Sequence, residues 1–318
     1  MARMSLAPTT IPSAHMEGSD IECPSFDGPV SDGKFRTHNV EKDEIQRFTV
    51  TDRDSGSYFK NSCRIVSCIH GHLEEDEGIA KRPGTLLVLE YRLQPKPGHR
   101  FSYVYTSFTF KDVPGAAEGE RASPEVIAYA PFRRPRNFDK TEANKTHHSG
   151  LYGKLGASGG AMPGTGEVGA DFSSEETHLQ QYFAKGAASI QYNDKTGLDD
   201  TVWWTLEQNK NQNLGVLPVF RVAVLLERSS LADFVGVFKM DVHGSFTHRL
   251  SQVGSSIDRF FRRFPVDDPI NFSPQKKPLQ GKTDGISQHK LLSLVDDKGD
   301  GDSLYLPDSY HIESFLPR

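Results

Sequence analysis

The residues best suited to hold a metal ion lie in one stretch, CRIVSCIHGH (63–72), which is apolar and β-branched enough to form a strand. Zinc prefers cysteine and histidine ligands, and alternation along a strand would place Cys68, His70 and His72 on one side. The same alternation puts Cys63 on the other side, and a structural zinc site usually takes its cysteines as closely spaced pairs. The metal-binding status of this stretch is therefore unknown from the sequence. The alternative is a small buried cysteine with exposed histidines beside an acidic turn.

A Gly-rich segment, residues 150–170, contains a match to the dinucleotide-binding motif. GTGEVGA (164–170) has the G-x-G-x-x-G/A spacing, which works where a strand turns into a helix whose N-terminus holds a pyrophosphate. Here GASGGAMP precedes the motif, acidic residues follow it, and the chain has no βαβ pattern. The phosphate-loop sequence G-K-[ST] is absent as well. We therefore predict no cofactor.

The Gly-rich segment also fits a hairpin that enters a membrane. Membrane-spanning strands alternate between apolar and polar side chains. One register contains Leu155, Ala157, Gly159 and Ala161, and the return register contains Val168, Ala170 and Phe172, with Pro163 and Gly164 at the turn. The apolar face is only modestly hydrophobic and lacks aromatic girdles. A packed pair of strands or a loop is the alternative, because glycine allows close backbone approach.

An acidic stretch near the end of the chain, DDKGDGDS (296–303), resembles a calcium-binding loop. Asp296, Asp300 and Asp302 would supply the oxygen ligands. Lys298 occupies a ligand position, however, and Pro307 stands where the closing glutamate is needed. We expect a solvated acidic turn.

No group of residues indicates catalysis. Asp199 and Asp200 precede a tryptophan-containing strand, where paired carboxylates in a cleft would suit acid–base chemistry. Adjacent acids at such a boundary are usually solvated. His147 and His148 have no nucleophile motif such as G-x-S-x-G nearby. We predict no catalytic residues and lean against an enzyme.

Strand patterns dominate the chain between residues 43 and 245. The strands are expected at 47–51, 63–72, 85–93, 100–112, 124–131, 173–192, 201–209, 217–228 and 233–244. Alternation predicts these core faces: Val104, Thr106, Phe108 and Phe110; Val202, Trp204 and Leu206; Phe220, Val222, Val224 and Leu226; and Phe234, Phe238, Met240 and Val242. Short links predict two hairpins, 85–93 with 100–112 and 217–228 with 233–244. This pattern favours an antiparallel β-sandwich.

A helical period appears only at residues 250–264, LSQVGSSIDRFFRRF. Its apolar stripe predicts an amphipathic helix that ends before Pro265. Four arginines accompany the stripe: Arg249, Arg259, Arg262 and Arg263. We expect the helix to dock on the sheet, and a helix lying on an anionic membrane is the alternative.

Composition limits the classes of partner. The net charge is −5, and the pI is about 6.2, so no basic face suggests nucleic-acid binding. The N-terminus has no apolar core of a signal peptide, and no apolar run is long enough for a membrane-spanning helix. Three cysteines (Cys23, Cys63, Cys68) are too few for a disulfide framework. These features predict a cytoplasmic protein with reduced thiols.

Several blocks of residues 85–275 resemble a family of β-rich proteins from filamentous fungi that has no established activity. The blocks are TLLVLEYRLQPKPGHRFSYVYTSFTFKD, PEVIAYAP, WTLEQNKNQNLGVLPVFRVAVLLERSSLADF and DDPINFSP. Gln208 ahead of Asn209 and the Pro-interrupted glycine segment depart from the family pattern. The resemblance implies a fungal origin and a β-rich fold, and it carries over no functional residues.

The sequence therefore predicts a disordered segment (1–42), a β-sandwich domain (43–245) and a docked helix with an irregular tail (246–318). We expect a non-enzymatic binding or interaction module that presents loops such as 133–150 and 153–173 to an unknown protein or small-molecule ligand. The alternative is a membrane-associating or pore-forming protein that uses residues 150–190.

Overall fold

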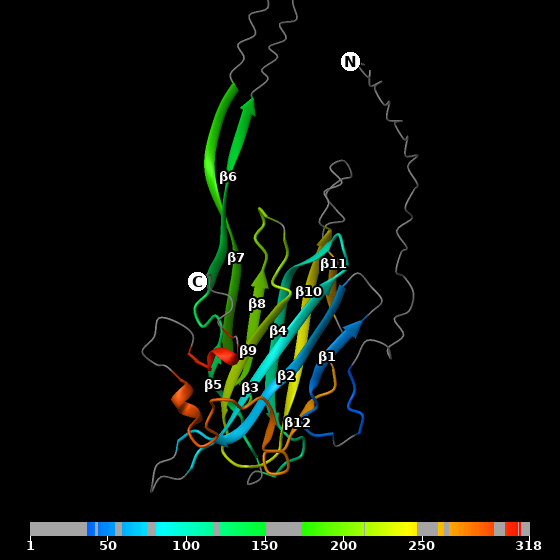
Figure 1. The fold of residues 1–318 in the computed structure, drawn as a ribbon, viewed down its shortest axis with the longest axis vertical. Helices are drawn as coiled ribbons and strands as arrows, with labels where there is room; N and C mark the ends of the chain where they lie inside the picture. Colours follow the sequence, from blue (N-terminus) through cyan, green and yellow to red (C-terminus); the bar gives the residue numbers. More distant parts are fainter. Residues whose placement is uncertain are drawn as a thin grey trace, which may run out of the picture. The chain divides into compact units, whose positions relative to one another are not determined.

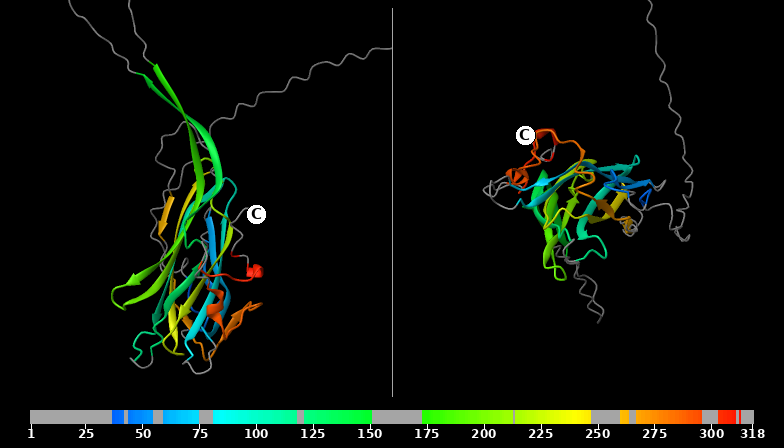
Figure 2. Two further views of the ribbon diagram at one scale, coloured as in Figure 1. Left: turned by 90° about the vertical axis from the view of Figure 1, so that its left-hand side faces the viewer. Right: turned by 90° about the horizontal axis from the view of Figure 1, so that it is seen from below.

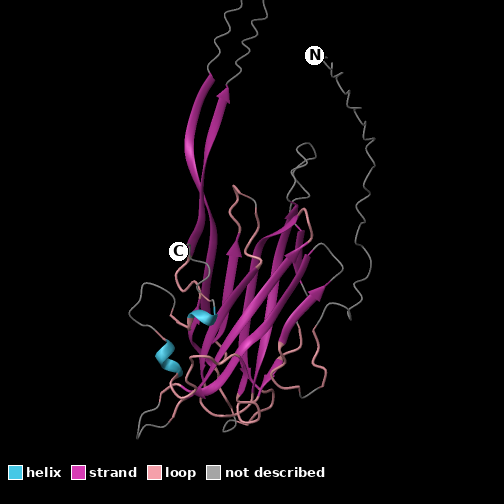
Figure 3. Ribbon diagram, viewed as in Figure 1, coloured by secondary structure: helices cyan, strands magenta, loops and turns pink. Residues whose placement is uncertain are grey.

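The structure is a computed structural model that describes residues 37–41, 44–54, 59–74, 81–117, 121–150, 173–212, 214–246, 260–263, 267–295, 303–310 and 312. The chain divides into two units, Met1–Asp32 and Gly33–Arg318, and every described residue belongs to the second. Those residues lie mostly in strands, with two short 3-10 helices and no α-helix among them (Figure 3). Within the described ranges, no helix has the length and apolarity to cross a membrane.

The strands form two antiparallel sheets (Figure 1). The first, called the β3 sheet, has the order β1 (Thr49–Asp54), β2 (Phe59–His72), β3 (Pro83–Pro95), β9 (Val219–Glu227) and β5 (Glu125–Ala130), with β13 (Leu279–Gly281) beside β2. The second, called the β4 sheet, has the order β11 (Phe260–Arg263), β10 (Phe234–Phe246), β4 (His99–Asp112), β8 (Leu198–Glu207), β7 (Ser173–Asn193) and β6 (Arg136–Gly150), with β12 (Ile270–Phe272) beside β10. The predicted antiparallel sandwich is confirmed.

One apolar core lies between the two sheets. Alternation along each strand sends one set of side chains inward, which removes apolar surface from water. The predicted faces are confirmed, because these side chains are buried: Val104, Thr106, Phe108 and Phe110; Val202, Trp204 and Leu206; Phe220, Val222, Val224 and Leu226; and Phe234, Phe238, Met240 and Val242.

A second apolar cluster covers the outer face of the β3 sheet. Here Ala223 and Leu225 of β9 pack with the C-terminal part of the chain, which adds Leu291 of η2 (Leu291–Leu294) and Tyr310 of η3 (Asp308–Tyr310). Figure 2 shows these orange and red segments beside the sheet. Strand β9 is therefore buried on both faces, which explains its nearly continuous apolar sequence.

Both predicted hairpins are wrong. The strands form at the expected places, but β3 pairs with β2 and β9, whereas β4 pairs with β10 and β8. Likewise β9 lies in the β3 sheet and β10 in the β4 sheet. Each short link therefore crosses from one sheet to the other. Inward-facing residues alternate in the same way whether consecutive strands pair side by side or face each other across a core, so alternation cannot separate the two arrangements.

The predicted helix at 250–264 is wrong where the structure describes it. Residues Phe260–Arg263 form strand β11, which pairs with β10 from Asp241↔Arg263 to Gly244↔Phe260. Pairing satisfies backbone groups along this edge of β10. The predicted arginines Arg262 and Arg263 belong to β11, and residues 247–259 lie outside the described ranges.

Two further predictions concern the strands around the Gly-rich segment. Residues 173–192 were expected to be a strand and are confirmed as β7. The loop expected at 133–150 is wrong, because residues 136–150 form strand β6, which pairs with β7. Because the polar segment β6 has few apolar side chains to bury, its strand conformation depends on backbone hydrogen bonds to β7.

Candidate functional site

Strands β6 and β7 form a hairpin that continues beyond the β4 sheet (Figures 1 and 2). Strand β7 pairs with β8 only from Lys185 to Asn193, whereas its pairing with β6 continues to Ser173↔Gly150. The ten pairs from Thr141↔Tyr182 to Gly150↔Ser173 therefore have no third strand beside them among the described residues. We call residues 141–150 and 173–182 the ribbon. Both of its edges carry unpaired backbone groups, which are templates for further strands.

Asn209, just after β8, holds the base of the ribbon. Its side chain is 4% exposed. Its Nδ2 donates to the carbonyl oxygen of Asp139 in β6 and, at 3.3 Å, to that of Tyr182 in β7. Its Oδ1 accepts from the Thr141 hydroxyl at 3.2 Å. One amide therefore fixes both strands where they leave the sheet.

The backbone of β6 bends at the same place. A bulge lies between Phe138 and Thr141, and Asp139 has a φ of 51°, in the left-handed region. Next to it, the ring of Phe132 fills the space above Gly186 of β7, where a Cβ would lie 2.5 Å from the ring. The bulge and this close packing set the direction in which the ribbon leaves the sheet.

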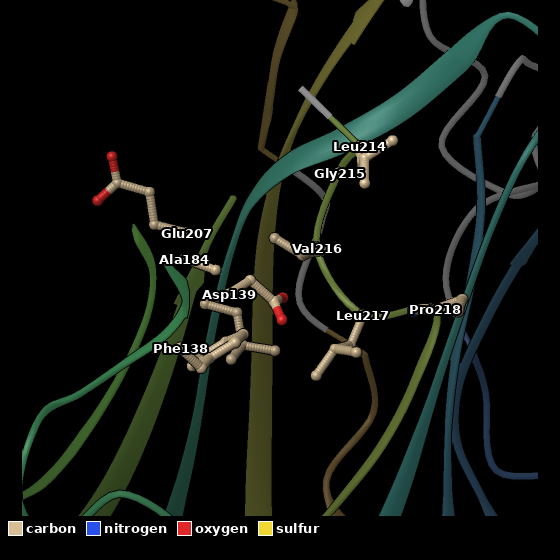
Figure 4. A pocket seen from close by; sticks show the side chains of 10 residues that line it. Phe138, Asp139, Ala184, Glu207, Leu214, Gly215, Val216, Leu217 and Pro218 are labelled. Carbon is tan, nitrogen blue, oxygen red and sulfur yellow. The ribbon is translucent and has the colours of Figure 1, made fainter. Parts of the chain in front are cut away.

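A cavity of about 190 Å³ adjoins the base of the ribbon (Figure 4). Phe138, Ala184 and Leu206 line one side, and the segment 214–218 lines the other. The lining is mainly apolar, and it includes the acidic residues Asp139 and Glu207, of which Glu207 directs its carboxylate away from the other lining side chains (Figure 4). The arrangement suits a small apolar group.

Near the sheet, the surface of the ribbon is polar. Glu142 and Gln181 are exposed and hydrogen-bonded to each other at 3.1 Å. The Lys140 ammonium lies 2.9 Å from Glu142, and this hydrogen bond lowers the pKa of the Glu142 carboxyl. Further along, the predicted His147 and His148 pair with Glu176 and Glu175 in the ribbon register. Sequence reasoning missed both the ribbon and Asn209, although the asparagine-rich run NKNQN at 209–213 signals a turn after β8.

In the stretch at 63–72, Cys68 and His70 lie on one side of β2 as alternation predicts, with the Cys68 sulfur 3.5 Å from the His70 ring, whereas the opposite side predicted for Cys63 is wrong. A bulge between Ile65 and Ser67 shifts the alternation of β2. Cys63 and Cys68 consequently both point into the core between the sheets. Among the described residues, no group of three or more histidine, cysteine or acidic side chains is arranged to hold a metal ion.

The buried groups of this stretch are held in their neutral forms. Burial raises the pKa of the Cys63 and Cys68 thiols, which keeps them protonated and unreactive. Burial lowers the pKa of His70 to about 3. The imidazole of His70 lies 2.9 Å from the hydroxyl of Thr85 and 3.5 Å from the Cys68 sulfur. These contacts satisfy the side chain as a structural histidine.

Other predicted groups are separated or not described. Asp200 is buried and accepts hydrogen bonds from Asn193 at 2.6 Å and Thr201 at 2.8 Å, which makes it a structural carboxylate. The dinucleotide-like motif at 164–170, the predicted hairpin turn and the carboxylates of 296–302 lie outside the described residues. Residues 1–36 of the predicted disordered segment also lie outside them, whereas Thr37 donates its amide to Asp267 at 2.8 Å.

Comparisons with known proteins give similarity of structure alone. No protein-family model and no curated protein matches the chain. The NetB toxin of Clostridium perfringens in its membrane-inserted form is similar over 71% of this chain and 90% of its own, with 8% identity and a TM-score of 0.26. A pore-forming protein is similar over 72% of this chain and 84% of its own, with 9% identity and a TM-score of 0.26. TM-scores this low carry no functional argument.

Proposed function

We propose that the protein associates with membranes and forms pores by inserting the Gly-rich segment between β6 and β7. The observation that carries the proposal is the ribbon, whose ten pairs extend past β8 with no further strand on either edge in the part of the chain that the structure describes. Strands of globular proteins usually have about 3–10 residues, and an isolated two-stranded hairpin is marginally stable in water. Strand β7 has 21 residues, of which about half pair with β6 alone. A ribbon of this length needs further partners.

The length of the linking segment suits a bilayer. Between Gly150 and Ser173 lie 22 residues, which would give each arm of a hairpin 10 residues around a two-residue turn. A membrane-spanning β-strand needs about 9–11 residues. The ribbon would then serve as the connection between the sandwich and the membrane.

The sequence of the segment alternates in the register that the ribbon sets. In the proposed inserted form, the register of the ribbon continues beyond Gly150↔Ser173. The lipid side then receives the alternate pairs Leu151 with Phe172, Gly153 with Ala170, and Leu155 with Val168. The other side receives Tyr152 with Asp171, Lys154 with Gly169, and Ser158 with Thr165. Apolar and polar pairs therefore separate by face, as a membrane barrel requires.

Several copies would have to act together. No water reaches the hydrocarbon core, so every backbone group there must be paired within the protein. One hairpin leaves two open edges, and closure of a barrel by hairpins from neighbouring copies satisfies both.

Dye release from anionic and neutral liposomes tests the proposal. Leu155→Lys places a charge on the lipid side, where it costs about 2–4 kcal/mol at the bilayer centre, so release falls by about tenfold or more. The matched control Ser158→Lys puts the same charge on the polar side and retains release. Equal thermal unfolding of both variants excludes misfolding as the cause. No release by the wild-type protein, or equal loss in both variants, would overturn the proposal.

A non-enzymatic binding module, as predicted from the sequence, is the second candidate function. The cavity beside Phe138 favours it, since a small apolar group of an unknown ligand or protein would fit there. Binding of a partner without vesicle leakage would favour this function over pore formation. The cytoplasmic location and the resemblance to fungal proteins stay predictions.

A further inference from the structure

A second cavity of about 190 Å³ lies at the opposite end of the sandwich from the ribbon. The ribbon begins beside Glu207, which pairs with Tyr103 near the start of β4. The second cavity adjoins His70, whose ring meets Phe234 edge-on at 6.1 Å, and Phe234 pairs with Asp112 at the end of β4. Four segments converge on this cavity: the end of β2, the β9–β10 loop, the chain after β12 and the chain before η2. We call it the β2-end cavity.

Arg228 is the main charged group at the β2-end cavity. It is 1% exposed, and its guanidinium donates to the carbonyl oxygens of Ser230 at 3.1 Å and Gly84 at 3.0 Å. Its Nε has no hydrogen-bond partner, and among the described residues no carboxylate pairs with it. A buried cation without a counter-charge costs free energy of folding. Burial accordingly lowers the pKa of Arg228 to about 10.

Two histidines line the same cavity. The rings of His72 and His289 stack in parallel with their centres 6.5 Å apart. Burial lowers the pKa of His72, and the neighbouring cations Lys81, His289 and Arg228 lower it further. The acids beside the loop are occupied elsewhere, since Glu227 pairs with Arg82 at 3.1 Å and Asp233 accepts from Ser273 at 2.6 Å. Neither acid therefore neutralises the Arg228 guanidinium at the cavity.

The backbone is built to hold the histidines together. A Cβ on Gly71 would lie 1.9 Å from the carbonyl oxygen of Gln288, so only glycine allows this approach. The same carbonyl oxygen accepts the amide of His72 at 2.8 Å. His289 follows directly, so its backbone is held beside the end of β2.

We propose that the β2-end cavity binds the phosphate group of a small compound through Arg228, His72 and His289. Phosphate supplies several acceptor oxygens and more than one negative charge, which match the charge of the arginine and two imidazoles whose protonated forms an anion favours. The volume is below the roughly 300 Å³ of common organic-ligand sites, so it takes a group and not a bulky molecule. The phosphate site itself is independent of pore formation, whereas the choice of a soluble compound over a lipid headgroup rests on that proposed function.

The position of the cavity favours a soluble phosphate compound over a lipid headgroup. A membrane entered through the ribbon would face the other end of the sandwich. Inorganic phosphate in solution and vesicles that carry phosphatidic acid are therefore the two arms of the test.

Calorimetric titration of the whole chain with inorganic phosphate, with chloride at matched ionic strength as reference, measures the binding. We expect saturable binding that His72→Gln and His289→Gln each weaken by about tenfold, the effect of one charged hydrogen bond. His38→Gln, an exposed histidine beside Asp268, is the control and leaves binding unchanged. Phosphate should also raise the pKa of His72 in an NMR titration, because an anion favours the protonated ring.

Three outcomes would overturn the proposal. The first is no saturable heat at tens of millimolar phosphate, and the second is equal weakening by all three histidine variants. The third is binding to phosphatidic-acid vesicles alone, which would replace the soluble ligand by a lipid headgroup. Arg228→Gln tests the arginine if the variant keeps the wild-type unfolding temperature, and the histidine variants decide the matter if it does not.

Discussion

Replacing Asn209 by alanine should loosen the ribbon at its base while leaving the sandwich folded. The substitution removes the hydrogen bonds that join Asn209 to Asp139 and Thr141 of β6 and to Tyr182 of β7. A net hydrogen bond contributes about 0.5–1.5 kcal/mol, so three of them contribute about 1.5–4.5 kcal/mol. A smaller share comes from cavity formation, because the side chain is 4% exposed.

The effect should be local, since these bonds connect the ribbon to the sheet and not the two sheets to each other. At about 1.4 kcal/mol for each factor of ten, a loss of 2 kcal/mol makes opening of the ribbon base about thirtyfold more frequent. Amide hydrogen exchange of residues 137–145 and 180–184 should accelerate by that factor. Exchange in β4 should change much less.

The control is Asn211→Ala, because Asn211 is exposed and its side chain makes one bond, of 3.3 Å, to Thr141. It should accelerate exchange by less than about threefold. Uniform acceleration throughout the sandwich would mean that Asn209 supports global stability and not the ribbon. Unchanged exchange at the ribbon base would refute the reasoning altogether.

Two other predictions concern stability. Gly186→Ala places a Cβ within 2.5 Å of the Phe132 ring, so urea unfolding should show a free energy of unfolding lower by about 1–3 kcal/mol. The control Lys185→Ala changes an exposed side chain and should alter this free energy little. Equal stability of the two variants would contradict the packing argument. Burial in the folded protein lowers the pKa of His70 from 6.5 to about 3. Between these pH values the unfolded chain protonates His70 and the folded protein does not, so the free energy of unfolding should fall as the pH drops from about 6.5 to about 3. A His70→Gln variant should lose this component of the pH dependence, and an unchanged slope would show that other groups dominate acid unfolding.

The sequence predicts the strands and their inward faces well, because alternation is a local property. The inward residues of β4 and β8 follow directly from it. Strand partners depend on contacts between residues far apart in the chain. The local pattern therefore predicts hairpins for β3 with β4 and for β9 with β10, which the structure does not form. In both cases a short link carries the chain across the core.

The candidate sites were less accessible from sequence for three physical reasons. One extra residue in β2 reverses the side to which later side chains point, so Cys68 joins Cys63 in the core. Strand β6 lacks an apolar face, so only its register with β7 reveals it as a strand. The β2-end cavity is lined by four segments that are distant in sequence, so no local sequence motif identifies it.

The ribbon is the feature of this fold that most requires a function. An edge strand invites pairing with other chains, and natural proteins usually shorten it, cover it or place charges on it. The described base follows that rule, since Lys140 and Glu142 stand on β6 beside the last residues held by the sheet. The ten following pairs prolong two edges without a third strand, and they end at a segment long enough to cross a bilayer and built from small and apolar residues. Such edges are a hazard for a protein that stays a monomer in water, and they are the requirement for one whose strands must join those of neighbouring copies in a membrane.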